Sequence, residues 1–110
     1  RVPIIEKHIV HAAYKCYVFV DNKNLNHKWD RNRIVKEINE LDVPCYWGSC
    51  SEIYLEKAFE NTSFRPKRRL KNAQKLGEES IMFLVHPSLK EVEIQKTCDV
   101  LSSVMNLACD

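Results

Sequence analysis

The residue types best suited to binding chemistry gather in one short stretch, residues 47–54, which reads Trp47-Gly48-Ser49-Cys50-Ser51-Glu52-Ile53-Tyr54. Two hydroxyls and a thiol surround one of only two glycines in the chain, with aromatic rings at both ends. Hydroxyl groups orient a polar ligand by donating and accepting hydrogen bonds. The composition therefore indicates the wall of a polar pocket, with the glycine at a turn that other residues resist. The alternative is an ordinary strand-to-helix loop in which Ser51 caps a helix.

Other side chains that could take part in catalysis or binding are scattered along the chain. His11 and Tyr14 open a predicted strand, and His86 follows another. The spacing matches no catalytic triad, metal signature, phosphate loop or pair of carboxylates. The five cysteines contain no CxxC pair, which favours reduced thiols over disulfides or a metal site. Taken alone, the chain is typical of a substrate-facing or interaction lobe rather than of a complete catalyst.

Length and composition indicate one globular domain covering residues 1–110. A net charge of +2 provides no broad field for nucleic acid or for a membrane surface, so neither partner is expected. The longest apolar run, residues 81–85, is too short to cross a bilayer. No secretory signal is visible, which favours a cytoplasmic location, and the start at Arg1 rather than at Met suggests a fragment of a longer protein.

Three strands and four helices would position the candidate residues. Apolar alternation predicts strands over residues 11–20 and 43–46, and the continuous apolar run 81–85 predicts a buried central strand. Helices are expected over residues 31–41 with Asp30 as N-cap, over 52–59, over 66–76 ending at Gly77, and from a capping box at 88–91 to about Asn106. The predicted fold class is α+β, with a small three-stranded mixed or antiparallel sheet covered on one face by helices.

Several motifs, in this order, resemble a known family. The strand His11-Ala12-Ala13-Tyr14-Lys15-Cys16-Tyr17-Val18-Phe19-Val20 is similar to the histidine-plus-aromatic strand that opens the C-terminal domain of DegT/DnrJ/StrS sugar aminotransferases. The resemblance continues to residue 106 through a helix near Arg31, Leu41-Asp42-Val43-Pro44-Cys45, the segment 49–59, Ala73-Gln74-Lys75-Leu76 and Phe83-Leu84-Val85-His86-Pro87.

This resemblance implies a fold-type-I, pyridoxal-phosphate-dependent enzyme that is a homodimer when full length. Such enzymes transfer an amino group from glutamate to a nucleotide-linked keto sugar in polysaccharide and glycan biosynthesis. The family's cofactor lysine and phosphate-binding residues lie in a large N-terminal domain. The chain would then be the C-terminal small domain, inactive when isolated, without a catalytic residue and without bound pyridoxal phosphate of its own.

The resemblance also points to substrate-binding residues. Many members carry a histidine-rich segment after the second strand, and Gly48 and Tyr54 occupy its two histidine positions, as in a subgroup with Gly-Ser-Cys in this loop. Leu84 also replaces a proline common in the family. We expect His11, Ser49, Ser51 and Tyr54 to orient the substrate. The alternatives are a stand-alone or regulatory protein-interaction module without catalysis, and a parent protein that kept the fold but lost its activity.

Overall fold

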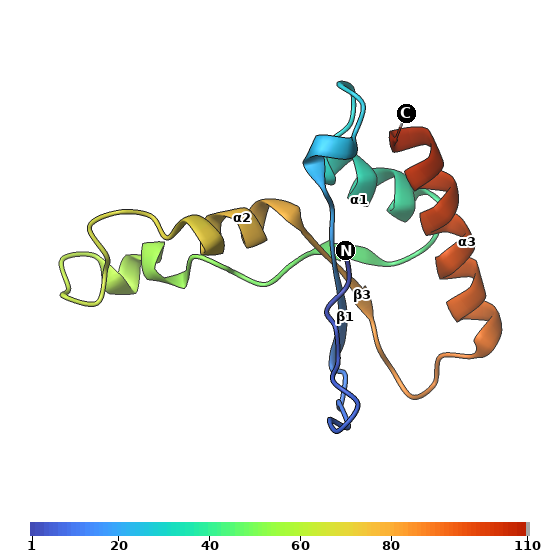
Figure 1. Cartoon of the computed structure of the whole chain (residues 1–110), viewed down its shortest axis with the longest axis horizontal. Coiled ribbons are helices and arrows are strands. Elements are labelled where there is room, and N and C mark those ends of the chain that lie inside the picture. Colours follow the sequence, from blue (N-terminus) through green and yellow to red (C-terminus); the bar gives the residue numbers. More distant parts are fainter. Residues whose placement is uncertain (110) are drawn as a thin grey trace.

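A three-stranded antiparallel sheet forms the centre of the molecule. The computed structural model describes residues 1–109, in which β1 (Lys15–Phe19), β2 (Cys45–Trp47) and β3 (Ser80–Leu84) pair in the order β1-β3-β2 (Figure 1). Both pairs are antiparallel, with Tyr17 and Tyr46 on either side of Met82. The prediction of a buried central strand is therefore confirmed, as is the α+β class with an antiparallel sheet.

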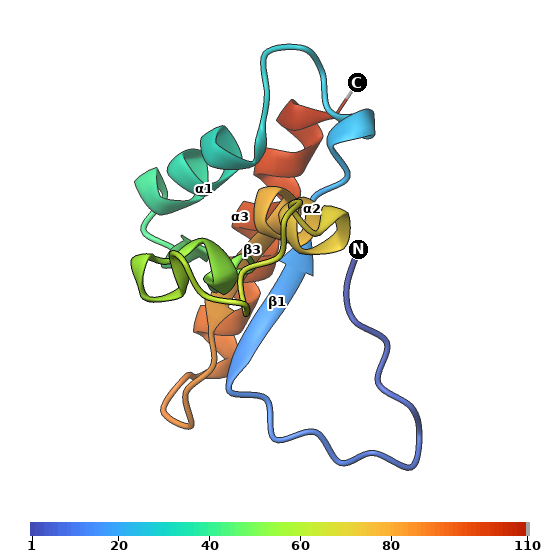
Figure 2. The ribbon, with the colours of Figure 1, turned by 90° about the vertical axis from the view of Figure 1, so that its left-hand side faces the viewer.

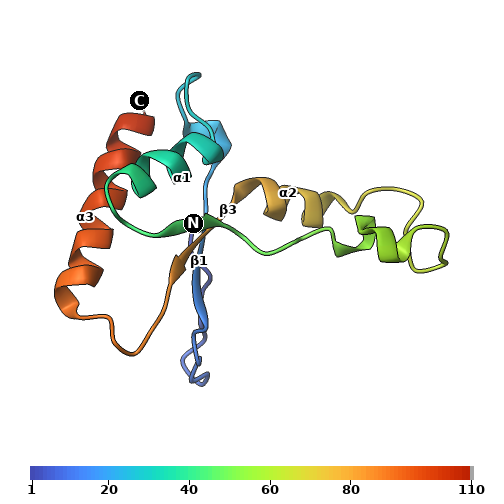
Figure 3. The same ribbon diagram turned by 180° about the vertical axis from the view of Figure 1, so that it is seen from behind.

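The helices divide into two groups. α1 (Arg31–Glu40) and α3 (Glu91–Ala108) lie together on one face of the sheet, whereas α2 (Lys71–Glu79) lies away from them on a projecting segment (Figures 1 and 3). Three short 3-10 turns complete the elements: η1 (Asn22–Asn24), η2 (Ile53–Leu55) and η3 (Lys57–Phe59). No helix among residues 1–109 has the length and apolar composition needed to cross a membrane.

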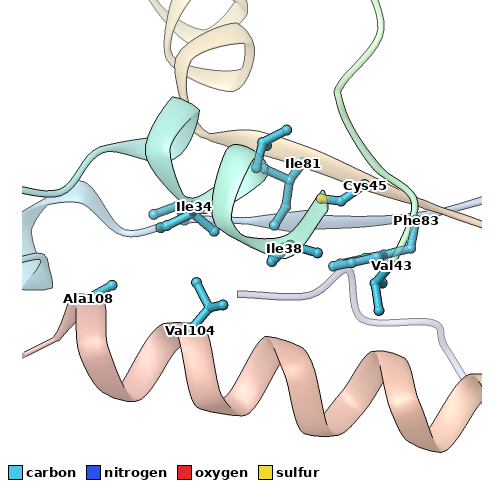
Figure 4. Packing of buried hydrophobic residues seen from close by; sticks show 10 residues of the cluster. Ile34, Ile38, Val43, Cys45, Ile81, Phe83, Val104 and Ala108 are labelled. Atoms are coloured by element: carbon cyan, nitrogen blue, oxygen red, sulfur yellow. The ribbon is translucent and has the colours of Figure 1, made fainter. Parts of the chain in front are cut away.

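The core lies between the sheet and the α1–α3 layer. Because side chains alternate along a strand, Ile81 and Phe83 of β3 point toward the helices, where they meet Ile34 and Ile38 of α1 (Figure 4). Val104 closes the cluster from α3. Ile34 and Ile38 are completely buried, and burying an aliphatic side chain of this size stabilises the fold by about 1.5–3 kcal/mol.

The predicted N-cap of α1 is confirmed, and its first turn also anchors the strands. The Asp30 carboxylate accepts a hydrogen bond from the Arg33 amide at 2.7 Å. The Arg31 guanidinium donates to the Ser80 carbonyl at 2.8 Å, where burial lowers the pKa of Arg31. The Trp47 indole donates to the Asn32 side-chain oxygen at 3.0 Å. The start of β3 and the end of β2 are therefore attached to the same helix turn.

The first predicted strand was too long and the second was displaced. β1 covers only five of residues 11–20 because Lys15 pairs with Leu84, the last residue of β3, so residues 11–14 have no partner strand. Tyr14 is 82% exposed. The second strand begins at Cys45 rather than residue 43, and the third spans Ser80–Leu84 rather than 81–85.

Three helix predictions require correction. The helix expected over 52–59 is instead the pair of turns η2 and η3, because Glu56 between them has extended backbone, and Ser51 caps neither turn. The helix expected over 66–76 is α2, which continues through Gly77 to Glu79. The last helix begins after Lys90, whose amide is bound by the Glu93 carboxylate, so the capping box predicted at 88–91 lies too early.

Asn39 protects the outer edge of β2. Its side-chain amide donates to the carbonyls of Cys45 at 2.6 Å and Val35 at 2.7 Å, and its oxygen accepts from the Cys45 amide at 3.3 Å. These are the hydrogen bonds that a neighbouring strand would otherwise make with Cys45. The exposed edge of the sheet is therefore partly satisfied from within the chain.

We predict that Asn39→Asp destabilises the fold by about 1–3 kcal/mol at neutral pH. The carboxylate would still accept from the Cys45 amide but would face two carbonyl oxygens that lose their donor. Protonation restores one donor, and the two carbonyls raise the pKa of the new carboxyl above its unfolded value near 4, so the loss should shrink as the pH falls towards about 4. Urea unfolding of both proteins at several pH values measures the difference, and a loss that is independent of pH would contradict this account.

Candidate functional site

The candidate site lies on an arm formed by residues 48–79, which leaves the sheet after β2 and returns at β3 (Figures 1 and 3). The β2–β3 register places Cys45 opposite Phe83 and Trp47 opposite Ile81. One further step in that register places Gly48 opposite Ser80, after which the returning chain is the helix α2 and the strand pairing ends. The arm therefore leaves the sheet at the Gly48–Ser80 pair, and its two limbs are residues 48–60, which lead out, and residues 61–79, which return.

Gly48 allows the limbs to approach closely at the base of the arm. Its amide lies 3.4 Å from the Ser80 carbonyl, and a Cβ at position 48 would stand 2.7 Å from the Ser80 Cβ. Directly opposed Cβ atoms in a sheet are normally about 4.5–5.5 Å apart. Gly48 has no positive φ, so the turn predicted at this glycine is wrong, and the constraint on this position is space.

Gly77 also faces a serine, but the space there is less restricted. A Cβ added here would overlap the Ser51 hydroxyl and would lie 3.4 Å from the Ser51 Cβ. The sequence pattern predicted Gly77 as the end of a helix, yet α2 passes through it. Both glycines of the chain thus face a serine on the opposite limb.

A polar cluster, here called the clasp and defined as Glu52, Tyr54 and Arg69, joins the limbs beyond this point. The Arg69 guanidinium binds both Glu52 carboxylate oxygens, one of them at 2.9 Å. The Tyr54 hydroxyl donates to the same carboxylate at 2.6 Å and accepts from the Leu70 amide at 2.9 Å. Bidentate pairs of this kind combine strength with a fixed geometry.

The clasp shifts the pKa values of its members in mutually consistent directions. Hydrogen bonds from Arg69 and then from Tyr54 lower the pKa of Glu52 from 4.5 to about 2. Burial and the bond to Glu52 raise the pKa of Tyr54, and the bond to Glu52 raises the pKa of Arg69. Glu52 is therefore a carboxylate, and Tyr54 a neutral phenol, throughout the physiological range.

The structure brings three of the four predicted substrate-binding residues together on the arm. The Ser49 hydroxyl hydrogen-bonds to the Tyr17 hydroxyl of β1. Tyr54 is buried, and its hydroxyl is occupied within the clasp. Within residues 1–109, the Ser51 hydroxyl makes no hydrogen bond. Of the three, Ser51 is the hydroxyl most available to a ligand.

His11 lies apart from the arm. It belongs to a loop that extends from Arg1, which is hydrogen-bonded to Phe19 of β1, to the start of β1 at Lys15 (Figure 2). The loop joins the Lys15 end of β1, whereas Ser49 contacts Tyr17. The described residues show no hydrogen bond between the His11 side chain and the arm.

An open groove of about 590 Å³ runs beside Ser51. Its other walls come from the start and the apolar side of α2: Leu70, Lys71, Asn72, Ala73 and Leu76. A hydroxyl and a lysine at the rim of a largely apolar groove can orient a polar ligand through a few hydrogen bonds. Among residues 1–109, no three side chains of metal-binding type gather.

The sequence pattern did not identify Glu52 or Arg69 as site residues. Arg69 belongs to a basic run, residues 65–71, and a short run of this kind is typical of a solvated helix face. A usable signal existed in the charge pattern: residues 61–77 hold six basic residues and no acidic one, whereas Glu52 stands on the opposite limb. To predict the Glu52–Arg69 ion pair from the sequence, one would have to know that the two limbs lie side by side.

We predict that Gly48→Ala lowers the free energy of unfolding by about 1–3 kcal/mol, as expected for a side chain forced into a packed contact. Rotation of the Ser80 side chain cannot relieve the contact, because its Cβ is itself too close. Ser80→Gly removes the obstacle, so the loss should be at least about 1 kcal/mol smaller in that background. Urea unfolding of the four proteins measures this cycle, and additive effects would show that the contact does not limit position 48.

We predict that Glu52 titrates near pH 2 in the folded protein and at a clearly higher pH in Arg69→Met, which removes the largest cause of the lowered pKa but leaves the Tyr54 hydrogen bond in place. Because the folded pKa lies below the unfolded one, ionised Glu52 stabilises the arm above pH 4.5. This contribution is lost as the pH falls from 4.5 towards 2. The carboxyl carbon chemical shift of Glu52 measures the titration. A wild-type midpoint near 4.5 would mean that the clasp is not formed.

Comparison with known proteins gives one informative similarity. No protein-family model and no curated protein matches the chain. Among solved structures, the X-ray structure of the aminotransferase from Psychrobacter cryohalolentis shares 54% identity over 90% of this chain, with a TM-score of 0.86. The chain spans only 25% of the length of that protein. The chain is therefore related to an aminotransferase, and its fold corresponds to about a quarter of that enzyme.

Proposed function

We propose that this chain is the C-terminal small domain of a pyridoxal-phosphate-dependent aminotransferase of the DegT/DnrJ/StrS family. The full-length enzyme transfers an amino group from glutamate to a nucleotide-linked keto sugar and acts as a cytoplasmic homodimer. The observation that carries the proposal is the 54% identity and matching fold shared with a solved aminotransferase over 90% of the chain. The order of the family-like motifs, described above, supports the sugar substrate.

The residues of this chain do not fit a cofactor site by themselves. Pyridoxal phosphate is held by a lysine that forms a Schiff base with it, and among residues 1–109 no lysine is buried. The lysine at the groove beside Ser51, Lys71, is exposed. We therefore assign the cofactor to another part of the proposed enzyme and derive no step through it.

The contribution of this chain is to bind and orient the sugar. Ser51 offers one donor and two acceptor lone pairs at the edge of the groove, which suit the hydroxyl groups of a sugar. Ser49, fixed by Tyr17, holds the backbone at the base of the arm. Tyr54 supports the arm through the clasp, and His11 lies on the segment that leads into β1.

The proposed reaction is tested with the full-length protein, 15N-glutamate and a panel of nucleotide-linked keto sugars. We expect 15N to appear in the sugar nucleotide, in an amount equal to the 2-oxoglutarate released. Absence of label from every sugar would overturn the proposed substrate class. A protein that also lacks the visible absorbance of bound pyridoxal phosphate would overturn the aminotransferase assignment.

We predict that Ser51→Ala raises KM for the sugar nucleotide about 2- to 12-fold, the equivalent of one neutral hydrogen bond of about 0.5–1.5 kcal/mol. The reaction with glutamate alone should keep its rate, because the sugar is absent from that half of the cycle. Ser102→Ala, on the exposed surface of α3, is the matched control and should change neither value. Equal behaviour of the two variants would show that Ser51 does not contact the sugar.

A further inference from the structure

The position of α2 depends on few contacts. None of its residues is buried, and no helix or strand among residues 1–109 packs extensively against it. Its apolar side is open, with Leu70 51% and Leu76 41% exposed. Helices much shorter than 12–15 residues are not stable in water without tertiary contacts. Whatever attaches this nine-residue helix to the opposite limb therefore determines the shape of the arm.

Two contacts join α2 to the opposite limb, one near each end, while Glu79 also binds the Val20 amide and the Arg1 guanidinium. At its C-terminal end, Gly77 lies against Ser51. At its N-terminal end, the Leu70 amide donates to the Tyr54 hydroxyl, which in turn donates to Glu52. Arg69, the residue just before Leu70, holds the same carboxylate with two hydrogen bonds. Glu52 thus receives three hydrogen bonds, two of them across the arm.

The Glu52–Arg69 contact joins the two limbs through a bidentate ion pair at the start of α2. Residues 61–77 carry six basic side chains and no acidic one, and Lys75 pairs within α2 with Glu79 at 3.7 Å. Glu60 meets Arg65 at 3.8 Å, at the limit of an ion pair. Glu52 meets Arg69 in a short bidentate contact, and the side chain of Glu52 is only 14% exposed.

We infer that Glu52 and Arg69 are positioning residues that fix Ser51 at the groove in which the sugar binds. The inference rests on the proposed function. Ser51 precedes Glu52 directly, so a carboxylate held in place by Arg69 also fixes the backbone that carries the Ser51 hydroxyl. Neither charged group needs to touch the substrate, because both act through the geometry of the loop.

The test uses the full-length enzyme with Arg69→Met, Glu52→Gln and Arg69→Lys. We expect Arg69→Met and Glu52→Gln to raise KM for the sugar nucleotide about tenfold while the rate of the glutamate half-reaction stays within twofold. Arg69→Lys, which keeps the charge but loses the bidentate geometry, should fall between them and wild type. Lys67→Met, an exposed basic residue of the same run, is the matched control and should behave as wild type.

Hydrogen exchange of the same proteins separates the two proposals. Amides in residues 49–56 should exchange at least tenfold faster in Arg69→Met, whereas those of α1 should not change. If wild type transfers no amino group to any sugar but exchange responds in this way, the proposed function fails and the clasp still positions the loop. If both half-reactions slow equally, if exchange does not respond, or if Arg69→Met matches Lys67→Met, the positioning role is overturned.

Discussion

The close approach of two limbs at the base of the arm is the constraint on which the candidate site depends. The chain leaves the sheet at Gly48 and returns at Ser80, and only the absence of a side chain at position 48 lets the backbones approach so closely. Gly77 and Ser51 make a second, looser contact further along the arm. Because the Gly48–Ser80 contact directly follows the β2–β3 pairing, the sheet sets the direction in which the arm leaves it. The small sheet therefore determines where the loop that carries Ser51 lies, although this loop is outside the hydrophobic core.

Beyond the two glycines, polar and charged contacts fix the geometry of the arm, rather than apolar packing. The arm has little apolar burial of its own, since Leu70, Leu76 and Phe64 remain substantially exposed. The clasp provides fixed geometry through charge-assisted hydrogen bonds, with the pKa of Glu52 held at about 2. A polar attachment of this kind fixes an orientation without requiring a hydrophobic interior. A polar attachment suits a projecting arm whose apolar surface stays exposed. The chain spans a quarter of the length of a related enzyme, so such a surface is expected.

Much of the fold could be predicted from local patterns, and the errors share one physical cause. The apolar run of β3, the Asp30 cap and the period of α3 are local signals, and each identified its element. The errors arose where the outcome depends on a partner distant in the chain. Residues 11–14 alternate like a strand but have no opposing strand, and Gly77 is typical of a helix end but lies inside α2, close to Ser51 of the other limb. For the same reason the hydroxyls of the site were found from composition, whereas Glu52 and Arg69, 17 residues apart, were not.

The central claim is that Ser51, presented by this arm, contacts the sugar of a nucleotide-linked substrate in an aminotransferase. A crystal structure of the full-length protein with an amino-sugar nucleotide product bound tests it most directly. The account predicts the Ser51 hydroxyl within about 3 Å of a sugar oxygen, a normal hydrogen-bond distance, with the Glu52–Arg69 contact intact. A sugar bound elsewhere, with the arm directed away from it, would contradict the account.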